Sequence, residues 1–130
     1  MTEFTPALDK QIRDFGRMLK LQLDFAAAAD LKKEDDQLEF ASRNNQTAGA
    51  LIRLMQVLQI KPKSDTQVME DVVAFAEKNG SDAGLELKAQ IAKVKAINEE
   101  AVKVAQERMA QKKPFSNEDL SAILKKHLKP

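Results

Sequence analysis

The chain has 130 residues, which suffices for one domain with a hydrophobic core, and its 21 Lys and Arg against 20 Asp and Glu give a formal net charge of +1. This balance argues against a general attraction to nucleic acid or to an anionic membrane. With no Cys and a single His, the sequence excludes disulfides, thiolate nucleophiles and metal sites rich in Cys or His, and we expect no cofactor.

The first predicted helix begins at Thr5, a hydroxyl N-cap, followed by Pro6 at the first helical position. Its apolar residues recur at spacings of three and four, which predicts one buried face made of Leu8, Ile12, Phe15, Leu19 and Leu23. We expect this helix to continue to about residue 33. A short turn is expected in the charged stretch 32–37, which contains neither Gly nor Pro. In the alternative, the chain runs straight on and the first two helices are continuous.

A second long helix is predicted over about 35–60. Its apolar seam has the spacing of a helix–helix contact and consists of Leu38, Ala41, Asn45, Ala48, Ile52 and Met55. Asn45 is a polar residue within that seam, and a paired amide at such a position fixes the register between helices. The small residues at 48–50 would let another helix approach closely.

Pro62 is expected to end the second helix, because it disfavours helical geometry at the preceding residue and lacks an N–H donor. Ser64 or Asp65 then caps a shorter third helix, predicted over 66–78. Gly80 follows it and is expected to adopt the left-handed conformation that ends helices.

A fourth helix is predicted over about 83–111, ending before Pro114. Asn98 lies on its apolar face, in the kind of position that Asn45 has on the second helix. We expect both amides at or near a helix–helix contact, within reach of each other. In the alternative, the helices rotate slightly and both amides face water.

The last segment has a clear start signal, with Ser116 as N-cap and with Phe115 and Leu120 at the two positions of a hydrophobic staple. It forms an amphipathic helix whose apolar face contains Leu120, Ile123, Leu124 and Leu128. This helix either docks on the bundle as a fifth core element, or hangs from a hinge at 112–114 and covers or presents a groove for a partner helix.

These elements predict an all-α protein: an antiparallel bundle of three long helices with one short helix and a C-terminal amphipathic helix. We expect a bundle over 1–113 and a hinged helix over 114–130. No apolar run reaches the length of a membrane span and the N-terminus lacks a signal-peptide pattern, so we expect a cytoplasmic protein without membrane insertion. The acidic residues lie mostly on polar faces beside lysines and His127 has no catalytic partner, so no enzyme is predicted.

Two stretches are similar to motifs of one protein family. "NNQTAGALIRLMQVL" (44–58) is a polar segment running into an apolar one, and "KAINEEAVKVAQERM" (95–109) places an Asn before apolar residues on a later long helix. In this pattern the chain resembles the FlgN family of flagellar export chaperones, which are small all-helical cytoplasmic proteins. It departs from the family at Ala101 and Val102, where a second Asn and a Gly are usual.

The resemblance implies a protein partner: the amphipathic terminal helices of exported hook–filament junction proteins, which the chaperone would shield. It also implies that the C-terminal region engages the partner, which puts forward Phe115, Leu120, Ile123, Leu124 and Leu128 as binding residues. The alternative is a structural bundle or adaptor with no chaperone role, which forms a homodimer through its long helices. No nucleic-acid partner is expected.

Overall fold

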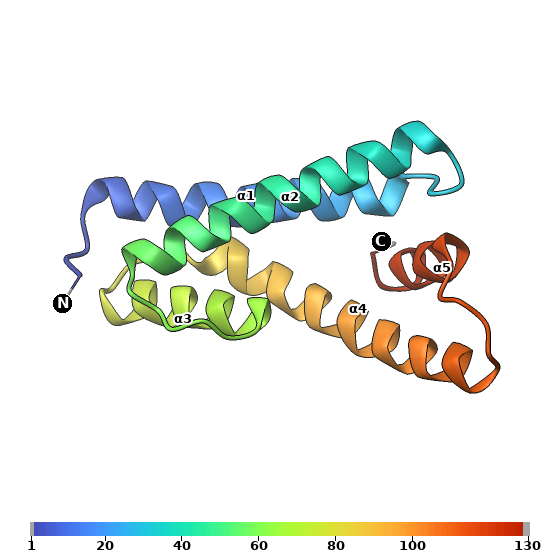
Figure 1. Cartoon of the computed structure of the whole chain (residues 1–130). Coiled ribbons are helices and arrows are strands. Elements are labelled where there is room, and N and C mark those ends of the chain that lie inside the picture. Colours follow the sequence, from blue (N-terminus) through green and yellow to red (C-terminus); the bar gives the residue numbers. More distant parts are fainter. Residues whose placement is uncertain (1, 129–130) are drawn as a thin grey trace.

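The computed structural model describes residues 2–128 and folds them into five helices (Figure 1). The helices are α1 (Pro6–Ala28), α2 (Glu34–Val57), α3 (Asp65–Lys78), α4 (Leu85–Ala110) and α5 (Asn117–Leu128). No strand occurs among these residues, so the predicted all-α class is confirmed. No helix of the described part has both the length and the apolar character needed to span a membrane.

The helices begin where their capping residues predict. The Thr5 hydroxyl accepts a hydrogen bond from the Leu8 amide at 3.1 Å, and Ser64 forms a reciprocal capping box with Gln67. Ser116 accepts from the amide of Asp119 at 3.2 Å in the same manner. Each of these starts was predicted from a hydroxyl placed just before an apolar repeat.

The ends of α2 and α4 differ from the prediction. α2 stops at Val57, before Pro62 is reached, because Gln59 takes a left-handed backbone with φ of 56°. Lys112 does the same after α4, also with φ of 56°. In both, an amide beyond the left-handed residue donates at 2.9 Å to the carbonyl five residues earlier, a Schellman-type ending. Gly80 is left-handed as predicted.

A turn separates α1 from α2, but it lies earlier than predicted: α1 ends at Ala28 and not near residue 33, and α2 begins at Glu34, inside the charged stretch 32–37. The turn is held by two side-chain hydrogen bonds, in which the Asp30 amide donates to Asp36 Oδ2 at 2.7 Å and Gln37 Nε2 donates to the Leu31 carbonyl at 2.7 Å. Leu31 itself is buried. The charged stretch therefore folds back through its own side chains, without Gly or Pro.

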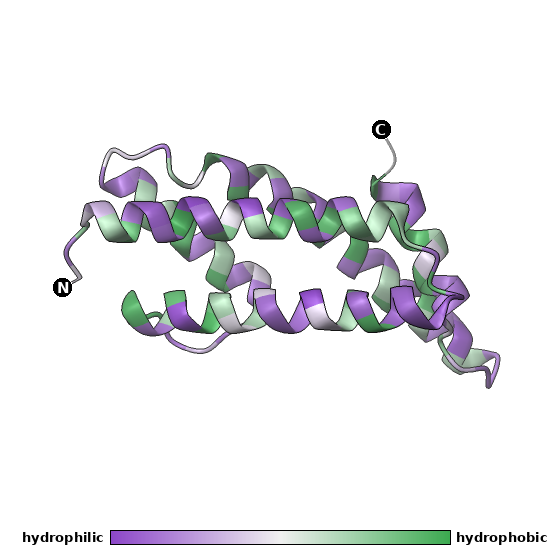
Figure 2. Ribbon diagram, turned by 90° about the horizontal axis from the view of Figure 1, so that it is seen from above, coloured by the Kyte–Doolittle hydropathy of each residue, from purple (hydrophilic) through white to green (hydrophobic). Residues whose placement is uncertain are grey.

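α1 is the central helix, and α2 and α4 pack against it separately. α3 fills the space between the end of α2 and the start of α4, while α5 packs on the far part of α4 and on α1 (Figure 1). From above, apolar and polar residues alternate along the helices, as expected of amphipathic helices with one covered face (Figure 2). The connection 111–116 between α4 and α5 contains the predicted boundary at 113/114. The predicted bundle (1–113) and the predicted hinged helix (114–130) include residue 1 and residues 129–130, which lie outside the described residues.

The tightest helix crossing joins α1 to α4 at Gly16. A Cβ atom placed there would lie only 2.9 Å from the backbone nitrogen of Leu87, so the two backbones touch. At Gly49, where a close crossing was predicted, a Cβ would meet only the side chain of Arg53, at 3.6 Å. The predicted close approach at 48–50 is therefore absent from the described chain.

The buried face of α2 also differs from the prediction. α2 turns Thr47, Leu51 and Leu54 toward α1 and leaves Leu38 and Ile52, two members of the predicted seam, largely exposed. Thr47 tolerates burial because its hydroxyl donates to the Arg43 carbonyl at 3.0 Å. The helix is thus rotated by about one position from the expected face, and of the predicted seam only Met55 packs against the core, as a partly buried residue.

Candidate functional site

A half-open cavity of about 510 Å³ lies beside α5, between α2 and α4. It exists because α2 and α4 both pack on α1 without touching each other: among residues 2–128, no Cα atom of α2 lies within 8 Å of one in α4 or α5. All five helices contribute to its lining, which is mainly apolar. We call this cavity the groove, and its apolar lining residues are Leu19, Leu23, Ala26, Phe40, Ala48, Leu51, Met69, Val94, Ile97, Leu120 and Leu124.

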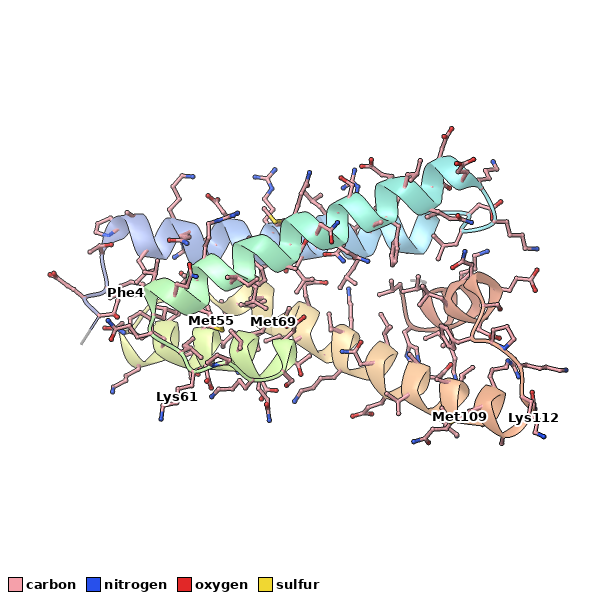
Figure 3. All side chains as sticks on the ribbon, viewed as in Figure 1. Phe4, Met55, Lys61, Met69, Met109 and Lys112 are labelled. Atoms are coloured by element: carbon pink, nitrogen blue, oxygen red, sulfur yellow. The ribbon has the colours of Figure 1, made fainter. Side chains whose placement is uncertain are left out.

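The groove has a defined floor, walls and ends. α1 supplies the floor, and α2 and α4 supply the two walls. Asp65 and Met69 of α3 close one end, and Leu120 and Leu124 of α5 close the other. Figure 3 shows Met69 beside α2, on the same side of the molecule as Met55, whereas Met109 and Lys112 lie at the distant end of α4.

Side-chain amides interrupt the apolar lining. On the floor, Gln22 donates through Nε2 to Asn44 Oδ1 of the α2 wall. The other atom of that amide, Gln22 Oε1, is buried and accepts no hydrogen bond within the part of the chain that the structure describes. A buried acceptor of this kind is costly unless a donor reaches it.

The structure brings the two predicted seam amides, Asn45 and Asn98, to the same groove. Asn45 lies on the α2 wall and Asn98 on the α4 wall, and both are exposed. Because α2 and α4 do not touch in the described chain, neither amide is buried at a crossing of these helices. Their arrangement matches the alternative in which the amides face water, at the mouth of the groove.

The five residues predicted to bind a partner lie in different environments. Leu120 and Leu124 line the end of the groove, but Leu124 is only 4% exposed and, like Ile123, is buried where α5 packs on the bundle. Leu128 is partly buried against the core, and Phe115 lies exposed in the connection before α5. With α5 in this position, only Leu120 and Leu124 are directed to the groove.

α5 is attached by an ion pair at its start. The Arg108 guanidinium donates to both carboxylate oxygens of Asp119, with the shortest contact at 2.7 Å, and Asp119 also accepts from the Ser116 amide at 3.0 Å. These hydrogen bonds, led by the one from Arg108, hold the pKa of Asp119 well below its usual range. The same pair raises the pKa of Arg108.

A second polar contact holds the end of α5. Glu100 Oε1 on α4 lies 2.7 Å from Lys126 Nζ and 3.0 Å from His127 Nε2. Hydrogen bonds from Lys126 and then His127 lower the pKa of Glu100. The only His of the sequence therefore has a structural partner.

The described residues contain no group of three or more His, Cys, Asp or Glu side chains placed to hold a metal ion. The cluster of Asp9, Arg13 and Asp82, joined by Ser81, connects α1 to the loop before α4 and is explained by that contact.

Comparison with protein-family models, curated proteins and solved structures finds no significant match to this chain. The resemblance to the FlgN family therefore remains a prediction from the two motifs, which the structure places on α2 and on the later part of α4. Apart from Asn98, the groove residues of α1 and α4 were not predicted as site residues. Their apolar spacing was visible, but the sequence carries no signal that α2 and α4 would separate.

Proposed function

We propose that this protein is a non-enzymatic helical binding protein whose groove holds the apolar face of a partner's amphipathic helix. The motifs on α2 and α4 favour a specific form of this activity, a cytoplasmic flagellar export chaperone that shields the terminal helices of hook–filament junction proteins. Binding would bury apolar side chains of the partner that otherwise promote its premature assembly.

The observation that carries the proposal is the half-open, mainly apolar groove. Its volume of about 510 Å³ falls within the range of about 300–1,000 Å³ for sites that enclose compact apolar ligands. A whole helix is about 10–12 Å wide, so the groove suits the side chains along one helix face better than an entire helix. Leu, Val, Ile and Met linings adapt to different apolar partners, as a chaperone requires.

The amides at the mouth of the groove complement this apolar lining. Asn45 and Asn98 lie on opposite walls and supply both donors and acceptors, so they suit the polar residues that flank the apolar face of an amphipathic helix. Leu120, and to a smaller extent the nearly buried Leu124, would contact the partner directly. Ile123 and Leu128 would act by holding α5 in position.

The test uses a matched pair of substitutions on α4. Val94 lines the groove, whereas Val102 lies on the same helix, outside the groove and largely exposed. A fluorescent peptide from the terminal amphipathic helix of a hook–filament junction protein is titrated with each variant, and anisotropy reports binding. Val94→Lys is expected to weaken binding at least tenfold, about 1.4 kcal/mol, and Val102→Lys to leave it unchanged.

Circular dichroism of both variants controls for folding. Equal loss in the two variants, or equal binding of a scrambled peptide that cannot form an amphipathic helix, would contradict the groove as the site. If the native protein ignores this peptide yet binds amphipathic helices from other proteins through Val94, then the flagellar form of the proposal fails while helix binding remains.

A further inference from the structure

An uncharged stripe runs along the outer side of α2. It consists of Leu38, Ala41, Asn45, Ala48 and Ile52, and we call it the α2 stripe. All five residues are exposed, with Leu38 at 62% and Ile52 at 49%. Their spacing of three, four, three and four is that of the a and d positions of a coiled coil. α1 packs on a different face of α2, so the stripe has no helix over it in the described chain.

The surroundings of the stripe are also free of charge. Its flanking e and g positions are Ser42, Asn44, Gly49 and Leu51. None of them is charged, although 32% of the residues in the chain are. Arg43 points elsewhere, because it pairs with Glu39 at 2.8 Å and lies over the ring of Phe25. In a parallel, in-register pair of identical helices each core residue meets its own copy, and the uncharged stripe and its flanks allow this without like-charge repulsion.

We propose that the α2 stripe is a homodimer interface, in which α2 of a second copy packs against it parallel and in register. Asn45 decides the orientation. In a parallel pair, Asn45 meets the same residue of the other copy, and each amide can donate to the other. In an antiparallel pair, Asn45 would face the methyl group of Ala48 and remain buried without a partner, which is costly.

Small residues allow the two helices to approach. Ala41 and Ala48 occupy the d positions, and a Cβ added at the neighbouring Gly49 would meet only the side chain of Arg53. The stripe from Leu38 to Ile52 is about 21 Å long at 1.5 Å per residue. An interface two heptads long is small, so the dimer dissociates on dilution. Asn45 and Ala48 also line the groove, so a second copy and a partner helix would compete for these two residues. The inference does not rest on the proposed function, because Leu38 and Ile52 lie outside the groove.

The first experiment measures mass by sedimentation equilibrium over a range of concentrations. The native chain is expected to rise from 14.5 kDa toward twice that mass. Leu38→Lys with Ile52→Lys is expected to remain at 14.5 kDa throughout and to keep its helical content, because both side chains are exposed in the single chain. The matched control is Leu85→Lys with Val102→Lys on α4, where the residues are 62% and 58% exposed; it should dimerise normally.

A native chain that stays monomeric at all concentrations would overturn the proposal, whether or not another protein covers the stripe. So would a stripe variant that still dimerises, or a control that loses dimerisation equally.

The second experiment tests the register and uses the absence of Cys from the sequence. In a parallel dimer, Asn45→Cys places two thiols within the Cα separation of about 4.4–6.8 Å that a disulfide requires, so oxidation is expected to yield a crosslinked dimer. Gln46→Cys, on another exposed face of α2, is the control and should remain uncrosslinked. If crosslinking instead requires a mixture of Asn45→Cys and Ala48→Cys chains, the helices are antiparallel and the proposed pairing of Asn45 is wrong.

Discussion

The two ends of this molecule are built differently. At one end, where α3 lies between α2 and α4, all six of the largest fully buried side chains gather: Phe15, Ile12, Leu54, Leu87, Val68 and Val72. At the other end, no residue of α4 after Ile97 is buried, and α5 is attached through Ile123, Leu124 and exposed or half-exposed ion pairs. The first end supplies the stability of the fold, and the second leaves apolar surface open for binding.

Glycine explains much of this difference. Gly16 brings α1 against α4 at the first end, and Gly84 lets the start of α4 approach α3, where an added Cβ would lie 3.2 Å from the Val73 Cα. No glycine occurs in the later half of α4, and the helices there are kept apart. The groove therefore begins where the helix backbones are no longer in close contact.

The largest expected effect is at the buried end. Leu87→Ala should lower the free energy of unfolding by about 2–5 kcal/mol, because Leu87 is fully buried and its removal leaves a cavity. Leu85→Ala, two residues earlier and largely exposed, should change it by less than about 0.5 kcal/mol. Urea denaturation measures both values. Similar values for the two variants would mean that this end is no more tightly packed than the other.

A pair of glycine substitutions tests the explanation itself. Gly16→Ala should destabilise the protein by about 1–3 kcal/mol, because the new methyl group forces α1 away from the Leu87 backbone. Gly49→Ala should stabilise it by up to about 1 kcal/mol, because the site is open and Ala is the better helix former. Thermal unfolding distinguishes the two by opposite shifts of Tm. A neutral Gly16→Ala would remove the proposed cause of the difference between the ends.

At the α5 end, a core substitution should release one helix without unfolding the rest. Ile123→Ala is therefore expected to increase the rate of proteolysis in the connection 111–116, by about tenfold for each 1.4 kcal/mol of docking free energy lost. Its effect on the urea midpoint should be smaller than that of Leu87→Ala, because the buried end remains folded. Equal loss of global stability would show that α5 unfolds together with the core.

Acid should loosen α5 by a small amount. The pKa of Asp119 is lowered in the folded chain, so its ion pair contributes fully above the unfolded pKa of about 3.9 and is lost as the pH falls toward the folded value. Glu100 contributes in the same direction, because its pKa is also lowered. The protection factors of the α5 amides in hydrogen exchange, which are relative to the intrinsic exchange rate at each pH, should therefore decrease below about pH 4.

Asp119→Asn provides the control for this pH dependence. It should show faster exchange of α5 already at neutral pH, and a smaller further change in acid, which leaves the part due to Glu100. If the exchange of α5 has the same pH dependence in the native chain and in Asp119→Asn, the ion pair with Arg108 is excluded as the source of that dependence.

Much of the secondary structure was predictable because its signals are local. Thr5, Ser64 and Ser116 are side-chain caps that act on residues within one turn, and all three were identified from the sequence. The left-handed residues Gln59 and Lys112 were missed, since neither is a glycine and their conformation follows from the helix ending around them. The ends of α2 and α4 were therefore assigned to Pro62 and Pro114, whereas the left-handed Gln59 and Lys112 end them.

The face of α2 and the groove were not predictable in the same way. α2 has two adjacent apolar stripes, and the sequence alone favoured the one with heptad spacing, from Leu38 to Ile52. Packing instead selected the stripe of Leu51 and Leu54, with Thr47 buried beside them. That choice, and the separation of α2 from α4 that creates the groove, depend on contacts with α1 and α3, which no local pattern encodes.

The short connection between α4 and α5 has a consequence for competition. A helix tethered by the few residues of 111–116 is present at its own docking site at an effective concentration on the order of millimolar. A partner that had to displace α5 would compete against that concentration and lose most of its apparent affinity. A partner that binds beside α5, against Leu120 and Leu124, avoids this competition. The tether therefore favours partners that bind in the groove next to α5 over partners that would replace α5 at its docking site.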